Sequence, residues 1–206
     1  MKKIKTSDTI ISLMLGLLVA VLVLIILRVI EADLNLGWQR GWDWVLLIGF
    51  PVLALLGIIA ASYIGRKYLT VYQLAKFYLI GASSVAIDLG ILNILMWFSG
   101  IVTGPLYILF KGLSASVSTM NGYLWNKYWT FEKRGYFFSV KEFFKFLLII
   151  SIGFLIDVSV ASFLVIVIGS RFGIPGTIWA NLGAFIAILI ASLWNFTGNK
   201  LFVFKK

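Results

Sequence analysis

Long apolar runs constrain the fold of this chain more than any other feature. Four are uninterrupted and two carry polar interruptions: 9–27, 45–64, 146–169 and 177–193, then 77–98 and 106–125. A helix that crosses the ~30 Å hydrocarbon core of a bilayer needs about 20 apolar residues. The sequence therefore predicts an all-α integral membrane protein with six transmembrane helices.

The composition supports this prediction and excludes several kinds of site. Of the 206 residues, 61% are hydrophobic and 13% are charged, whereas a soluble domain is close to half apolar and a quarter charged. The chain has no Cys and no His, which excludes thiolate or imidazole metal sites, Ser-His nucleophiles and disulfides. No Gly-rich phosphate loop is present either. We therefore expect no metal, no ATP and no other cofactor.

The cations predict the orientation. Most of the 18 Lys and Arg residues lie at alternate ends of the six runs, and the opposite ends hold only Arg28, Arg40 and Arg171. Since cytoplasmic loops carry the excess of positive charge, both termini are expected on the cytoplasmic side of the cytoplasmic membrane. The net charge of +10 then faces the anionic inner leaflet, so no nucleic-acid partner is required.

The last two thirds of the chain contain an internal repeat. A shift of 69 positions (157 − 88) places residues 66–88 over 135–157, so that Lys76 and Asp88 match Lys145 and Asp157. A shift of 73 (199 − 126) places 126–131 over 199–204. Each repeat holds two helices and returns the chain to the same side, so the copies are expected to be parallel.

Capping boxes mark the start of each repeat. Thr70 is followed three positions later by Gln73, and Ser139 by Glu142, the spacing at which two side chains satisfy the first amides of a helix. We expect short interfacial helices at these points, before the third and fifth spans. The expected domains are an appended helix pair, 1–65, and a four-helix domain, 66–206, with repeats 66–134 and 135–206.

Two copies of K-F-x-L-I…I-D, each followed by N-K-x-[WF]-x-F, make residues 66–206 resemble the GtrA-like family. The resemblance implies a small four-helix membrane protein of cell-envelope polysaccharide glycosylation that moves polyprenyl-phosphate-linked monosaccharides across the cytoplasmic membrane. The family core usually stands without the segment 1–65. Its ending often has Arg where this chain has Lys127 and Lys200, and Lys acts on a phosphate only as a point charge.

Asp88 and Asp157 are the first candidate site residues. Each lies 12 residues beyond the interfacial Lys of its repeat, which is ~18 Å along a helix and close to mid-bilayer. An acid there costs on the order of 3 kcal/mol on insertion scales and by default marks a functional site. The alternative is an acid that only fixes helix packing.

Polar stripes on the fourth and last spans supply further candidates: Lys111, Ser114, Ser118 and Asn121 on the fourth, and Asn195 and Asn199 on the last. Such stripes also arise from ordinary interhelical hydrogen bonding. Lys111 lies about one turn from the outer end, where it either snorkels to the headgroups or receives a lipid phosphate.

Asn126, Lys127, Asn199 and Lys200 are expected at the inner interface. An amide both donates to and accepts from sugar hydroxyls, and Lys neutralises a phosphate, so these residues are candidates for loading the sugar-phosphate head. The alternative is that they anchor the helices, as basic and aromatic residues do at membrane interfaces.

The leading hypothesis is therefore a flippase for a polyprenyl-phosphate-linked monosaccharide. The alternative is a non-transporting scaffold or anchor for a glycosyltransferase, and a homo-oligomer is compatible with either. A membrane-embedded enzyme is disfavoured because, apart from Asp8, the cytoplasmic side offers only Glu132 and Glu142 as carboxylates. The expected partners are the lipid-linked sugar and membrane lipids.

Overall fold

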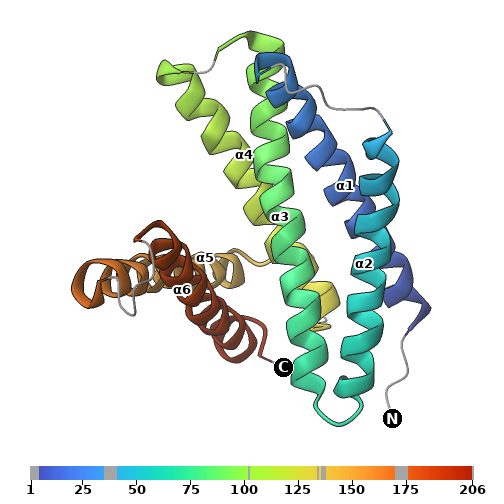
Figure 1. Ribbon diagram of the computed structural model, residues 1–206. Coiled ribbons are helices and arrows are strands. Elements are labelled where there is room, and N and C mark those ends of the chain that lie inside the picture. The colour runs from blue at the N-terminus through green and yellow to red at the C-terminus, as the bar shows by residue number, and fades with distance from the viewer. Residues whose placement is uncertain are drawn as a thin grey trace. The chain divides into compact units, whose positions relative to one another are not determined.

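A computed structural model describes residues 5–34, 41–101, 103–133, 135, 138–169 and 176–205. The described residues form helices and short connections, without a strand (Figure 1). The α-helices are α1 (Thr6–Leu34), α2 (Trp42–Gly65), α3 (Leu69–Ser99), α4 (Gly104–Trp125), α5 (Val140–Ser162) and α6 (Gly176–Gly198). Three π-helical segments follow α4, α5 and α6: η1 (Asn126–Thr130), η2 (Phe163–Ile168) and η3 (Asn199–Val203).

Five of the helical segments in the described ranges are long and apolar enough to cross a membrane: Thr6–Arg28, Trp42–Gly65, Leu69–Ser99, Val140–Ile168 and Leu182–Val203. The chain is thus a helical membrane protein. α4 has 22 residues, a sufficient length, but its Lys, Ser and Asn side chains keep it out of this set. A sixth span at α4 stays a prediction.

The two capping boxes have different outcomes. Ser139 is the N-cap of α5, and its side chain accepts a hydrogen bond from the Glu142 backbone amide. The prediction for Thr70 is wrong, because α3 begins at Leu69 and its N-cap is Tyr68, which makes no side-chain cap. The short interfacial helices are also not separate elements: the first turns of α3 and α5 continue directly into the long helices.

The chain divides into two compact units, Met1–Glu132 and Lys133–Lys206. The boundary lies two residues before the predicted start of the second repeat at residue 135. In the first unit, α3 packs against α1, α2, α4 and η1; in the second, α5 packs against α6, η2 and η3. The grouping of both repeats into one four-helix domain remains a prediction.

Helix contacts in the first unit are close. At Gly16 of α1, an added Cβ would lie 2.6 Å from the Pro51 Cα of α2, so only glycine lets these two backbones approach so closely. Leu15, Ile58 and Ile80 contribute to the core that joins α1, α2 and α3. The N-terminal helix pair is therefore integrated with α3 in one packed body.

Candidate functional site

The two Asn-Lys segments have the same local structure. Both lie in π-helical turns, in which the Phe131 amide donates to the Asn126 carbonyl at 2.9 Å and the Phe204 amide to the Asn199 carbonyl at 2.8 Å. These bonds span five residues, one more than in an α-helix. π-turns are rare and are found frequently at functional sites, and here they end both α4 and α6.

The two asparagine side chains also match. Asn126 Nδ2 donates to the Gly122 carbonyl at 2.8 Å, and Asn199 Nδ2 donates to the Asn195 carbonyl at 2.7 Å. Asn126 is 4% exposed and Asn199 is fully buried, yet neither Oδ1 atom has a donor among the described residues. A buried acceptor without a donor costs about 1–3 kcal/mol. Each repeat thus contains one oriented, buried amide oxygen whose acceptor capacity no described residue uses.

The adjacent lysines differ in exposure. Lys127 is only 1% exposed, and its Nζ donates to the Tyr123 hydroxyl at 3.3 Å. Lys200 is partly exposed, with its Nζ 5.6 Å from the centre of the Phe196 ring. Both lysines therefore lie by an aromatic ring one turn earlier, but Lys200 is the more accessible cation.

Asp88 of α3 binds two side chains of α4. Ser114 Oγ donates to its Oδ1 at 2.6 Å, and the Lys111 ammonium forms an ion pair with its Oδ2. Lys111, expected to face outer headgroups, thus has an intramolecular partner, although its side chain remains 42% exposed. The pair is neutral overall, which lowers the cost of an acid at this depth.

Ser118 and Asn121 join α4 to α3. Ser118 Oγ donates to the Ser84 carbonyl at 2.7 Å, and Asn121 Nδ2 donates to the hydroxyl of Ser84 at 2.9 Å and that of Ser83 at 3.4 Å. These contacts are the interhelical hydrogen bonds that polar stripes make in membrane proteins. Any role of Ser118 or Asn121 toward a substrate stays a prediction.

Asp157 and Asn195 lie along the packed helices of the second unit. Neither the Oδ1 atom of Asp157 nor that of Asn195 has a hydrogen-bond donor in the described part of the chain, and both atoms are buried. Asn195 faces Gly153 of α5, where an added Cβ would lie 2.1 Å from the amide oxygen. Asp157 is one turn beyond Gly153 on the same helix.

A comparison with known families bears on these residues. The family described as GtrA/DPMS, transmembrane domain, matches residues 76–204, which is more than half of the chain. The chain belongs to the GtrA/DPMS transmembrane domain family. None of the curated proteins and none of the solved structures matches it.

The GtrA/DPMS match covers every candidate residue above and begins at Lys76. In general terms, membership indicates a role in the translocation of lipid-linked sugars. α1 and α2 lie outside the matched range, so the comparison gives no role for the N-terminal pair.

The first residue of the GtrA/DPMS match forms a buried cluster with α1 that sequence reasoning missed. Asp8 Oδ1 accepts hydrogen bonds from Lys76 Nζ at 2.6 Å and Trp129 Nε1 at 2.8 Å, while its Oδ2 accepts from the Tyr72 hydroxyl at 2.7 Å. Asp8 and Lys76 are each 2% exposed. The sequence did contain a signal for this pair: an acid, Asp8, near the start of one long apolar helix and a lysine, Lys76, near the start of another.

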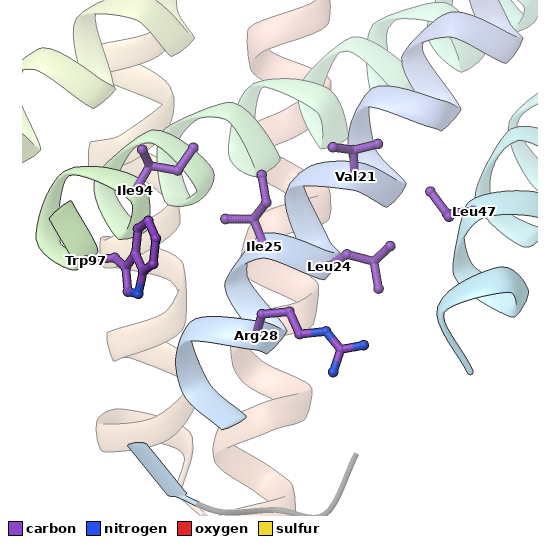
Figure 2. A pocket seen from close by; sticks show the side chains of 7 residues that line it. All are labelled: Val21, Leu24, Ile25, Arg28, Leu47, Ile94 and Trp97. Atoms are coloured by element: carbon purple, nitrogen blue, oxygen red, sulfur yellow. The ribbon is translucent and has the colours of Figure 1, made fainter. Parts of the chain in front are cut away.

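An apolar groove of about 520 Å³ opens among α1, α2 and α3 of the GtrA/DPMS protein. Figure 2 shows its lining side chains: Val21, Leu24, Ile25, Arg28, Leu47, Ile94 and Trp97. Arg28 also forms an ion pair with Asp43 of α2. The groove is therefore apolar, with the Arg28 cation among its lining residues.

In the described ranges, no group of three or more acidic, His or Cys side chains is placed so that it could hold a metal ion.

Proposed function

We propose that this GtrA/DPMS protein flips a polyprenyl-phosphate-linked monosaccharide across the cytoplasmic membrane, for glycosylation of a cell-envelope polysaccharide. The observation that carries the proposal is the pair of matching π-turns. Each contains an asparagine, Asn126 or Asn199, whose amide oxygen accepts no hydrogen bond among the described residues, and a lysine follows that asparagine in sequence. A sugar phosphate supplies the complementary groups, hydroxyl donors and an anion.

Loading takes place at the π-turns, which the predicted topology puts at the inner leaflet. Lys200 is the accessible cation for the phosphodiester, and Asn199 accepts a sugar hydroxyl. Lys127 and Asn126 provide the corresponding groups in the first repeat. The polyprenyl tail stays in the lipid, since only the polar head needs a path.

The route across the membrane follows the polar residues of the long helices. Asp88 with Lys111 lies on α3 and α4, whereas Asp157 and Asn195 lie on α5 and α6. Ser118 and Asn121 support the first group by holding α4 to α3. The protein acts without ATP and without chemistry on the sugar, and both termini are cytoplasmic.

The proposal is tested with the full-length protein in phosphatidylcholine liposomes that contain a fluorescent polyprenyl-phosphate hexose. Periodate, which does not cross the bilayer, oxidises the sugars of the outer leaflet, so flipping exposes the remaining pool. We expect the native protein to expose that pool and Asn126→Ala/Asn199→Ala to slow exposure at least about tenfold, the effect of one lost ligand hydrogen bond.

Asn93→Ala is the matched control. Asn93 Nδ2 donates to the Leu89 carbonyl at 2.8 Å, the same side-chain bond within a helix but outside a π-turn. Equal rates for the native protein and the double alanine variant would refute the loading role. Protein that is correctly inserted yet flips no sugar lipid, and that retains a bound glycosyltransferase on purification, would instead establish the scaffold alternative.

A further inference from the structure

The two repeats differ in how they neutralise their membrane acid. Asp88 has the Lys111 ammonium and the Ser114 hydroxyl of α4 as partners. The 73-residue shift that aligns the repeat endings places Ala184 and Ala187 of α6 at the positions of Lys111 and Ser114. The second repeat therefore lacks both the cation and the hydroxyl.

The packing within the second unit agrees with this alignment. An added Cβ at Gly198 would meet the side chain of Ile149, and one at Gly153 would meet Asn195. The register of antiparallel α5 and α6 thus puts Asp157 level with the next turn of α6, where Ala187 is fully buried and Ala191 is 7% exposed. These small side chains offer no hydrogen-bond donor.

The other helical elements of the second unit that the structure describes do not supply the missing charge. α6 and η2 contain no ionisable residue. On α5 the cations are Lys141 and Lys145, and Lys145 lies 12 residues, or ~18 Å, away from Asp157 along the helix. Glu142 is paired with Lys133 at 2.7 Å. Lys200 of η3 lies 9 residues (200 − 191), or ~14 Å, along α6 from Ala191, which is level with Asp157. Among the described residues of the second unit, Asp157 is therefore an acid without a countercharge at its level of the helix pair.

We infer that Asp157 binds one monovalent cation, a proton or a sodium ion, and that Asp88 does not. An uncompensated carboxylate in a membrane helix costs several kcal/mol, which uptake of one positive charge removes. Two further amide oxygens without a hydrogen-bond donor lie along the contact line between α5 and α6, here called the seam. They belong to Asn195 and, one turn farther along α6, to the fully buried Asn199. Oxygen atoms are the ligands that hard cations take. A bound proton comes from the aqueous phase and returns to it.

Cation binding does not depend on the sugar, but its use as the driving force rests on the proposed function. The seam leads from Asp157 through Asn195 to Asn199, one of the loading residues. Binding of the cation at one side and its release at the other would give the transport a direction.

The test uses infrared difference spectroscopy on the full-length protein in phosphatidylcholine nanodiscs, without substrate. One arm lowers the pH in the absence of sodium, and the other adds NaCl at constant alkaline pH. A protonated-carboxyl band in the first arm identifies a proton, and a shifted carboxylate band in the second identifies sodium. Either signal should be lost in Asp157→Asn and retained in Asp88→Asn/Lys111→Met, which removes both members of the neutral pair.

Ala184→Lys provides a second variant. It adds a cation at the position of Lys111 and should abolish the signal while Asp157 is intact. Variants are compared only as monodisperse protein with native helical circular dichroism. A signal unchanged in Asp157→Asn, or no signal in either arm, would overturn the inference. A protein with the signal that flips no sugar would refute the proposed function alone; one that flips but lacks the signal would refute the cation site alone.

Discussion

Lys76 of α3 donates to Asp8 of α1 over 2.6 Å, and the two residues are 68 positions apart in sequence. The Lys76 ammonium also lies 4.5 Å from the centre of the Tyr72 ring and 5.1 Å from that of Trp129. Both arrangements stabilise a buried cation. This ion pair joins α1 of the N-terminal helix pair to Lys76 of α3, the first residue of the GtrA/DPMS match.

Lys76→Met is expected to destabilise the protein by about 3–5 kcal/mol, because it leaves Asp8 charged and buried. Asp8→Asn/Lys76→Met should recover most of this loss, since the asparagine oxygen keeps an acceptor for Trp129 and its NH2 group can donate to the Tyr72 hydroxyl. The measurement is thermal unfolding in detergent micelles, followed by circular dichroism. Lys145→Met is the control at the matching position of the second repeat, where the lysine is exposed, and it should leave the midpoint nearly unchanged. Equal losses for the two lysines would contradict the role of the buried pair.

Lys127→Ala and Lys200→Ala should have different effects. Lys127 is buried against Tyr123, so its removal should lower the unfolding midpoint as well as the rate of flipping. Lys200 is partly exposed, so Lys200→Ala should slow flipping about tenfold or more with little change in stability. Lys200→Arg should keep most of the rate because it keeps the charge. Transport is measured per correctly inserted molecule, and an unchanged rate in Lys200→Ala would remove this residue from the loading site.

Gly153→Ala should destabilise the second unit. The added methyl group would lie 2.1 Å from Asn195 Oδ1, so α5 and α6 must separate or the amide must move. Gly112→Ala in α4 meets nothing within 4 Å and should be neutral or stabilising by up to about 1 kcal/mol, the difference in helix propensity. Unfolding midpoints decide the comparison. If the clash is the cause, Gly153→Ala/Asn195→Ala should be more stable than Gly153→Ala.

Single cysteines test the topology, because the native chain contains none. Thr103→Cys should react in intact cells with a maleimide that does not cross membranes, whereas Lys67→Cys and Gly135→Cys should react only after permeabilisation. Labelling of residues 103 and 135 from the same side would show that α4 does not span. The loops around residues 36 and 172 are also expected on the extracytoplasmic side of the membrane. They are not among the residues that the structure describes.

The helices could be predicted from sequence because apolar length alone determines which segments can span a bilayer. The matching geometry of Asn126 and Asn199 follows from repeated local sequence, although the π-turn itself has no signature that distinguishes it from an α-helix. The contacts of Asp88 with α4 could also be predicted from the sequence, because two consecutive helices joined by a short loop usually pack together.

The partner of Asp8 could not be predicted in this way. Its donors come from residues 72, 76 and 129, and nothing local indicates which buried acid meets which distant lysine. Thr70 shows a related limit: its spacing to Gln73 fits a cap, but α3 begins one residue earlier. The difference between Asp88 and Asp157 depends on which side chains of the neighbouring helix reach each acid, and the spacing of residues along one helix does not specify this.

Because Trp129 follows Asp8 by 121 positions, the cluster also sets an order of events during biosynthesis. The acid leaves the ribosome first, Tyr72 and Lys76 follow, and the indole arrives only after α4 has been made. α1 must therefore enter the membrane region with its carboxylate unpaired and wait for most of the first unit. A chain interrupted before Trp129 would display an incompletely satisfied acid, a chemical mark by which quality-control proteases can recognise an unfinished molecule.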